Sequence, residues 1–227
     1  MRNGNNDDKD DATTRLLSEE LQAYLAQVQS MSTSSLMVAK SKPRALRPSA
    51  ELISLVDKIG LDLDQLEETL RAICQTPYAN LGLRSLPLLI PKSAALEKST
   101  VEIIVFAFST LGSSLLRSSL VKWLVACRSL WTREAKQFMR DSYAVWFGFI
   151  NHLHRLHLCR LLHLLTHRQD VTPWRCRVLS QVLQRDTSFS PLALAELFAR
   201  FAPRWIKFPT RFFSFFTKKH IAEESQT

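Results

Sequence analysis

The sequence is poor in glycine, and it has no long apolar run. Only five of its 227 residues are Gly, which is few for a β-sandwich or for an enzyme with a phosphate-binding loop. The longest segment without a charged residue, 21–39, has 19 residues but is rich in Gln, Ser and Thr. The strongly apolar uncharged segment, 103–116, has only 14, whereas a membrane-spanning helix needs about 20 predominantly apolar residues. These two absences favour a helical protein with a buried core and predict no membrane segment.

Motifs for catalysis are also missing. The sequence contains no GxSxG, P-loop, GxGxxG or HExxH pattern, and its adjacent acids Glu67 and Glu68 fit a solvated helix face. No two cysteines form a CxxC pair, and each lies in an apolar stretch, which favours free thiols in a reducing compartment: Cys74, Cys127, Cys159 and Cys176. We therefore predict a protein that is not an enzyme and that has no catalytic residue, cofactor or small-molecule substrate.

One histidine-rich stretch, 152–167, is the strongest candidate for a metal site. On a helix, His152, Cys159 and His163 would share a face, and His163 and His167 form an i, i+4 pair. Neighbouring arginines oppose a cation, and the helical rise puts His152 and Cys159 about 10 Å apart, too far for one ion. We predict that no metal binds here.

Composition divides the chain into three parts. Residues 1–47 are predicted to contain a disordered acidic tail, a possible short amphipathic helix and a Ser-rich linker, and they lack the apolar core of a signal peptide. Residues 48–217 are predicted to form a helical-repeat domain, and residues 218–227 a polar C-terminal tail.

The middle part predicts nine or ten helices joined by short turns, with no β-hairpin signal. One long helix is expected over 132–150. Caps, stops and first-turn prolines are expected at Ser49, Gly60, Asp62, Ser113 or Ser114, Thr172, Pro173, Ser190 and Pro191. The class is therefore all-α. Short connections indicate antiparallel neighbours, packed either as a globular bundle or as a superhelical stack of helix pairs.

Positive charge is concentrated in the second half of the chain. Residues 1–100 hold 12 Lys/Arg against 13 Asp/Glu, whereas residues 101–227 hold 18 against eight. This imbalance favours an acidic partner (nucleic acid, an acidic protein surface or an anionic membrane), although arginines that merely shield helix surfaces give the same count. The predicted contact residues are Arg175, Arg177 and Arg185, because guanidinium groups suit carboxylates and phosphates.

A basic, aromatic segment, 204–219, follows the last predicted helix. It could contact nucleic acid or a membrane surface. Alternatively, it forms a final helix whose Phe residues close the core.

Three stretches carry a resemblance to a known family. They read LVKWLVA (120–126), CRLLHLLTHRQDVTPWRCRVL (159–179) and LFARFAP (197–203), and the middle stretch is the most specific. Their order and spacing resemble the N-terminal helical region of the centromere protein I (CENP-I) family, over roughly residues 50–210. Family members are several times longer, so the chain is expected to be a fragment or a short form.

The resemblance implies a HEAT-like stack of antiparallel helices that serves as a non-enzymatic scaffold of the inner kinetochore. It implies CENP-H, CENP-K and CENP-M as partners within the constitutive centromere-associated network, at the centromere in the nucleus. It also implies support of CENP-A deposition and chromosome segregation. The alternative is a basic helical protein that binds nucleic acid directly, and a weak DNA contact through the basic half is compatible with both functions.

Overall fold

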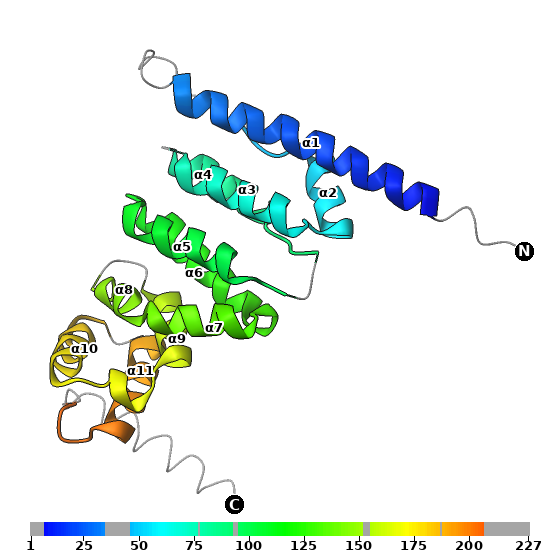
Figure 1. Ribbon diagram of the computed structural model, residues 1–227. Helices are drawn as coiled ribbons and strands as arrows, with labels where there is room; N and C mark the ends of the chain where they lie inside the picture. Colours follow the sequence, from blue (N-terminus) through cyan, green and yellow to red (C-terminus); the bar gives the residue numbers. More distant parts are fainter. Residues whose placement is uncertain are drawn as a thin grey trace, which may run out of the picture. The chain divides into compact units, whose positions relative to one another are not determined.

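The structure, a computed structural model, describes residues 7–34, 46–76, 78–92, 95–151, 155–186 and 188–206. All elements of these residues are helical, and the only β-type pairing among them is two isolated bridges (Figure 1). The chain divides into two compact units, Met1–Met139 and Arg140–Thr227. This division falls inside the segment 48–217 that the sequence predicts as one domain, and the outer boundaries of that segment stay predictions.

The helices of the first unit are α1 (Asp7–Ser34), α2 (Ala50–Ile59), α3 (Leu63–Gln75), α4 (Ala79–Ser85), α5 (Lys98–Thr110), α6 (Ser114–Ala126) and α7 (Arg133–Asp141). The last two residues of α7 already belong to the second unit. That unit holds α8 (Tyr143–Gly148), α9 (Leu156–Leu165), α10 (Pro173–Arg185) and α11 (Phe189–Phe201). Three 3-10 turns complete the description: Leu86–Leu88, Cys127–Leu130 and Arg168–Asp170.

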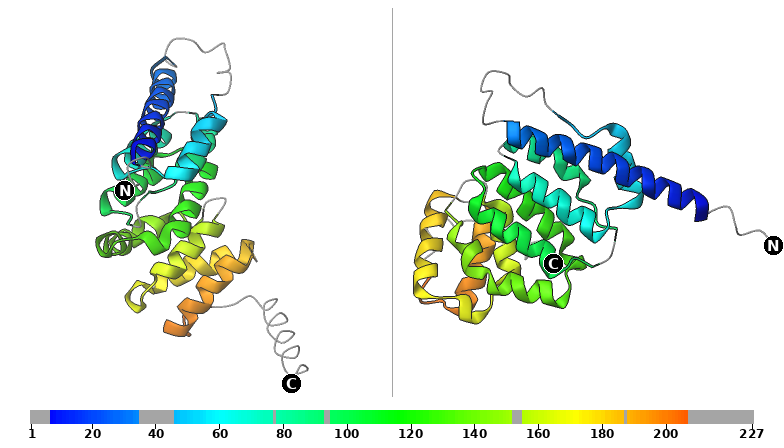
Figure 2. Two further views of the ribbon diagram at one scale, coloured as in Figure 1. Left: turned by 90° about the vertical axis from the view of Figure 1, so that its right-hand side faces the viewer. Right: turned by 45° about the horizontal axis from the view of Figure 1, so that its top comes forward.

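The first unit is a stack of helices in two layers. Helices α1, α3 and α5 lie side by side in one layer, with α3 in contact with both of the others (Figure 1, Figure 2). In the second layer α2 packs on α1, and α4 packs on α3 and α6. The faces between the layers carry fully buried side chains, among them Leu21, Leu52, Leu70, Ile104 and Leu120. This arrangement confirms the predicted all-α, helical-repeat class and excludes the alternative of a single globular bundle for this unit.

The backbone is paired at two equivalent points of the first unit. Leu61, just before α3, forms a parallel bridge with Pro91, and Leu96, just before α5, forms one with Trp131. In each bridge the leucine amide donates to the residue before its partner, and the leucine carbonyl accepts from the residue after it, at 2.6–3.1 Å. The two leucines are 35 residues apart, a spacing typical of helical repeats. The repeat is visible in the backbone although the sequence shows no clear identity at this period.

Gly60 makes the first bridge possible. It ends α2 with a positive φ of 73°, and its amide donates to the carbonyl of Val56 at 2.8 Å. A Cβ atom at this position would lie 2.6 Å from the Cα atom of Lys92. Two features therefore require glycine at this position: the positive φ angle and the close approach of the Lys92 backbone.

Several predicted helix starts are confirmed. Side-chain oxygens of Ser49, Asp62, Ser113 and Thr172 each accept a hydrogen bond from the backbone amide three residues later, at 2.9–3.3 Å. Pro173 occupies the first turn of α10, as expected. Helix α11 begins earlier than predicted, at Phe189, and includes Ser190 and Pro191.

Helix α1 is much longer than the short segment predicted for the N-terminal part. It begins at Asp7, inside the stretch expected to be disordered, and runs for 28 residues. Its buried side chains, Leu17, Leu21, Tyr24, Leu25 and Val28, form one apolar stripe, whereas Leu16 is exposed. The stripe packs on α2 and α3, so tertiary contacts stabilise a helix whose acidic start has little to bury.

The predicted helix over 132–150 is wrong in one respect, because it is broken at Ser142. The Ser142 carbonyl accepts hydrogen bonds from two amides, those of Val145 (3.0 Å) and Trp146 (3.3 Å). This tighter turn interrupts the regular helix where the first unit gives way to the second. The predicted tail 218–227 and most of the basic, aromatic segment 204–219 lie outside the described residues.

The second unit is built around stacked aromatic rings. Helix α9 packs on α8 and α11, and α10 packs on α11. Phe147 of α8 stacks on Phe198 of α11 with ring centroids 6.2 Å apart, and both rings are buried. Trp174, at the start of α10, touches the same Phe147 at 5.9 Å. This core fixes the start of α10, the helix that carries all three predicted contact arginines.

Candidate partner-binding surface

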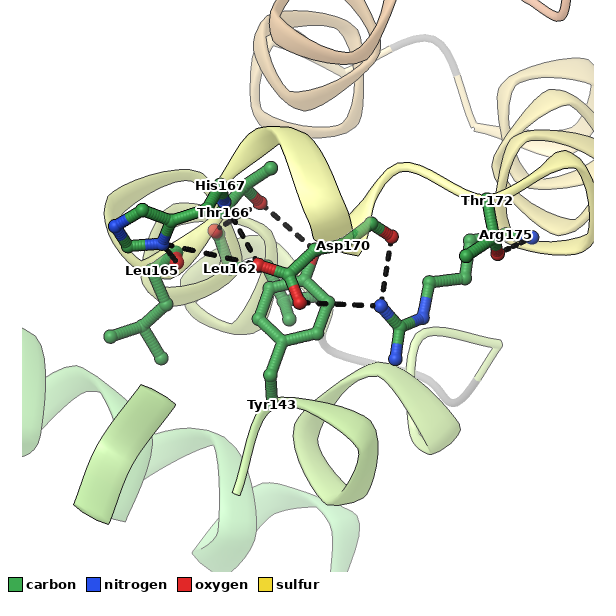
Figure 3. Close-up of polar contacts among 8 residues, drawn as sticks. All are labelled: Tyr143, Leu162, Leu165, Thr166, His167, Asp170, Thr172 and Arg175. Carbon is green, nitrogen blue, oxygen red and sulfur yellow. Dashed lines mark hydrogen bonds and ion pairs between the residues drawn. The ribbon is translucent and has the colours of Figure 1, made fainter. Parts of the chain in front are cut away.

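Arg175 is held inside the second unit. Its Nη1 donates to the backbone carbonyl of Asp170 at 2.8 Å and reaches the Asp170 carboxylate at 3.4 Å (Figure 3). The side chain of Arg175 is only 17% exposed, and so is that of Asp170. A guanidinium that is mostly buried and bound to a carbonyl and a carboxylate of its own chain is poorly placed to contact another protein.

Two further contacts fix this arrangement. The Asp170 carboxylate also accepts from the backbone amide of His167 at 2.9 Å, so the 3-10 turn that contains Asp170 is closed on itself (Figure 3). The ring Nδ1 of His167 donates to the carbonyl of Leu165 at 2.8 Å. The turn between α9 and α10 is therefore rigidly bonded on both sides of the carboxylate that receives Arg175.

Aromatic rings cover the other side of Arg175. Its guanidinium lies over the ring of Tyr143 at 4.8 Å and over that of Phe147 at 5.6 Å. The Tyr143 hydroxyl donates to Thr166 Oγ1 at 2.9 Å, since the Thr166 hydroxyl hydrogen is used by the carbonyl of Leu162 at 2.7 Å (Figure 3). Burial raises the pKa of Tyr143, so the phenol stays neutral under the cation. Stacking of this kind is typical of arginine in a structural role.

The other two predicted residues, Arg177 and Arg185, have different surroundings. Both are exposed, and neither forms an ion pair with any part of the chain that the structure describes. They lie eight residues apart on α10, about 12 Å along the helix, with the exposed Gln181 between them. Of the three predicted contact residues, only these two present their guanidinium groups to solvent.

The second unit as a whole is rich in such arginines. Residues 140–206 contain nine Arg, no Lys and only four acids. Arg155 pairs with Asp186 at 3.3 Å, and Arg175 pairs with Asp170. The other seven are exposed and have no ion pair among the described residues: Arg140, Arg160, Arg168, Arg177, Arg185, Arg200 and Arg204. The surface of this unit therefore carries a surplus of arginine charge that its own acids do not balance.

Exposed aromatic rings accompany these arginines. Trp174 is 58% exposed on the first turn of α10, next to the stripe that holds Arg177 and Arg185, and Trp205 is also exposed. Trp and Arg are the residues most enriched at the energetic centres of protein interfaces. Trp174 could not be recognised as a contact candidate from the sequence, which does not show whether its ring is exposed. We define Trp174, Arg177, Gln181 and Arg185 as the α10 surface.

The residues that the structure describes form no cluster that could hold a metal ion. No three His, Cys, Asp or Glu side chains converge there, and in α9 Cys159 is buried whereas His163 is exposed. His152 and His154 lie outside the described residues. Burial raises the pKa of Cys159 to about 12 and that of Cys127 to about 11, so these thiols are poor nucleophiles at neutral pH. None of the described helices combines the length and apolarity that a bilayer crossing requires.

The chain is similar to known proteins in sequence and in fold. A family model described as "CENP-I: Mis6" matches residues 2–222. No curated protein matches the chain. A crystal structure of centromere protein Cenp-I is similar with a TM-score of 0.61 and 19% identity, and the match covers 84% of this chain and 90% of that one. A crystal structure of the kinetochore subunits Cenp-H/I/K triple complex is similar with a TM-score of 0.63 and 20% identity, covering 84% and 89%.

Proposed function

The chain belongs to the CENP-I (Mis6) family, and from this premise we propose that it is a non-enzymatic scaffold subunit of the inner kinetochore. The observation that carries the proposal is the α10 surface, where an exposed Trp174 adjoins two arginines without an acid partner among the described residues. A scaffold acts by shape and charge complementarity, and such a surface fits an acidic helical partner. No step of chemistry is needed.

The proposed partners are CENP-H and CENP-K, because one of the similar structures is a complex of Cenp-H, Cenp-I and Cenp-K. By family resemblance, CENP-M is a further proposed partner, and the proposed location is the centromere in the nucleus. Support of CENP-A deposition and chromosome segregation is the proposed consequence of that assembly. Within the α10 surface, Arg177 and Arg185 are the proposed contacts, and Arg175 contributes by holding the helix in place.

Co-elution with a purified CENP-H/CENP-K pair on a sizing column, in low and in moderate salt, tests this function. The double variant Arg177→Glu/Arg185→Glu is expected to weaken the complex about tenfold or more, since the reversal sets negative side chains against the acidic partner. Its matched control is Arg128→Glu/Arg133→Glu, which makes the same change of charge at exposed arginines of the first unit. Equal binding by wild type and both variants would remove the α10 surface from the interface, and absence of any complex would overturn the scaffold function.

The second candidate function is direct binding of nucleic acid. The surplus of exposed arginines beside exposed aromatic rings favours it, because the same groups contact phosphates and stack on bases. Titration of duplex DNA with the chain alone tests it, at several salt concentrations. An affinity that falls steeply with salt, with a logarithmic slope of about −0.9 for each phosphate contacted, would support this function. If DNA binding is undetectable at moderate salt, the scaffold function is the only candidate that remains.

A further inference from the structure

A groove opens between α3 and α5 of the first unit. Its volume is about 360 Å³, and it is lined by Arg71, Cys74 and Gln75 of α3 and by Glu102, Ile103, Phe106, Ala107 and Thr110 of α5. The two helices pack side by side, and residues of both line the groove (Figure 1 shows the two helices). None of its residues belongs to the α10 surface.

The floor of the groove is apolar, and its lip is an exposed aromatic ring. Ile103 and Cys74 are half-buried and Ala107 is buried, whereas Phe106 is 75% exposed. A phenylalanine this exposed next to an apolar floor is a feature of docking surfaces. Its position one turn from both Glu102 and Thr110 puts it in the middle of the α5 wall.

The two walls carry opposite charges. On α3, Arg71 donates to the carboxylate of Glu67 at 2.7 Å, and that carboxylate is fixed from α5 by the Thr100 hydroxyl at 3.3 Å. On α5, Glu102 pairs with Lys98 at 3.2 Å. Arg71 and Glu102 nevertheless keep 51% and 47% of their side chains exposed, so each can bind a second group. The groove thus has a basic edge and an acidic edge on either side of an apolar floor.

We propose that this groove binds one amphipathic helix of a protein partner. A helix is the occupant of the right form, because the groove between two packed helices accepts the side-chain ridge of a third. Its apolar stripe covers Ile103 and Ala107 beside Phe106, with an acidic side chain toward Arg71 and a basic one toward Glu102. A purely acidic helix, which suits the α10 surface, would place no basic side chain opposite Glu102. The groove therefore takes a different segment from the one at α10.

This inference rests on the proposed scaffold function, so the test uses the full chain with the CENP-H/CENP-K pair. Cys74 is a natural reporter, because it is the one half-buried residue among the four free cysteines and it lines the groove. Iodoacetamide labelling of Cys74 at pH 9, followed by mass spectrometry, is expected to slow at least tenfold in the complex. The alkaline pH is needed because burial raises the pKa of this thiol to about 12.

A pair of phenylalanine variants completes the test. Phe106→Ala removes the lip and is expected to weaken the complex about tenfold, while the fold stays intact because the ring is exposed. Phe189→Ala is the matched control, since Phe189 is 78% exposed on the first turn of α11 and lies outside the groove. It is expected to bind like wild type.

The outcomes separate the two proposals. A complex in which Cys74 reacts as fast as in the free chain, or in which Phe106→Ala binds normally, overturns the groove proposal and leaves the scaffold function standing. If wild type forms no complex, the scaffold function fails, and the groove proposal fails with it. A third outcome concerns the chain without its partners. If labelling of Cys74 slows as the chain's concentration rises, and the chain elutes at twice its mass, the occupant is a second copy and the proposed partner helix is wrong.

Discussion

The two units use their charged side chains in different ways. In the first unit the ion pairs join residues four positions apart on a single helix: Arg15–Asp11, Arg71–Glu67 and Lys98–Glu102. Among the described residues of the second unit, the two arginine–carboxylate pairs join different elements. Asp186, after the end of α10, binds Arg155, before the start of α9, and Asp170 of the 3-10 turn binds Arg175 of α10.

The difference reflects the supply of acids. Residues 1–139 hold 17 Lys/Arg against 15 Asp/Glu, whereas residues 140–227 hold 13 against six. A pair within one helix adds only a few tenths of a kcal/mol, but a half-buried pair between elements fixes how they pack. Where acids are scarce, two of them hold the junctions of the fold, and the remaining arginines stay available to a partner.

Among these substitutions, Arg175→Ala is expected to have the largest effect on the free energy of unfolding. The substitution leaves the half-buried Asp170 carbonyl without its donor, and the Asp170 carboxylate with the His167 amide but without its cation. It also removes the cation from the rings of Tyr143 and Phe147. We expect a loss of about 2–3 kcal/mol in the free energy of unfolding, measured by urea denaturation. The control is Arg177→Ala, two residues away on the same helix but exposed, with a change within about 0.5 kcal/mol. Equal effects of the two substitutions would contradict the structural role of Arg175.

Alkaline pH should affect both units alike. The thiols of Cys74 and Cys127 in the first unit, and of Cys159 and Cys176 in the second, all have pKa values raised by burial from an ordinary value of 9.0. Above pH 9 the unfolded chain loses thiol protons that the folded chain keeps, so stability falls as pH rises from 9 toward about 12, the pKa of Cys159. Each thiol lowers the free energy of unfolding by at most about 1.4 kcal/mol per pH unit.

Urea denaturation at pH 8, 9 and 10 measures this loss. A chain with Cys159→Ala should show a shallower decline above pH 9 than wild type, because one of the shifted thiols is gone. A stability that stays flat from pH 8 to pH 10 would show that burial does not shift these groups.

Two buried threonines of the first unit differ in whether their hydroxyl groups are hydrogen-bonded. The Thr100 hydroxyl donates to the buried Glu67, whereas Thr69 Oγ1 is buried with no hydrogen-bond partner among the described residues. Replacement by valine keeps the shape and removes the hydroxyl. Thr100→Val should therefore lower the free energy of unfolding by about 1 kcal/mol, and Thr69→Val should raise it by a similar amount. Thermal denaturation of both variants checks the sign, and two changes in the same direction would refute the assignment.

The smallest effect is expected at the surface of α1. Arg15 and Asp11 form an i, i+4 pair with both side chains largely exposed. Arg15→Ala should change the free energy of unfolding by no more than about 0.5 kcal/mol, and 1 M salt should remove even this difference. A loss comparable to that of Arg175→Ala would mean that pairs within a helix matter as much as pairs between elements.

Helix starts could be predicted from the sequence because their cause is local. The caps at Ser49, Asp62 and Thr172 need only a side-chain oxygen and an amide three residues away. The break at Ser142 could not be predicted in this way, since the residues around it suit a continuous helix and none of them is a Gly or Pro that would end one.

The role of Arg175 was hidden because it depends on residues that are distant in the sequence. The sequence shows that residue 175 is a cation, but it does not show whether the guanidinium already binds another group of the same chain. Asp170 is five residues away, whereas Tyr143 and Phe147 come from α8, and only the fold brings all three to Arg175. Arg177 and Arg185 look the same as Arg175 in the sequence, and their exposure became evident only with the register of α10.

A substitution at Gly60 should lower the amount of folded protein without changing its binding surfaces. Any side chain there collides with the backbone of Lys92, yet the residue touches neither the α10 surface nor the lining of the groove. A Gly60→Ala allele should therefore be conditional, tolerated in cool-grown cells and lost in warm ones as the stack opens. Cells that carry this allele would show the effect of having less of the protein, because the residues of its binding surfaces are unchanged.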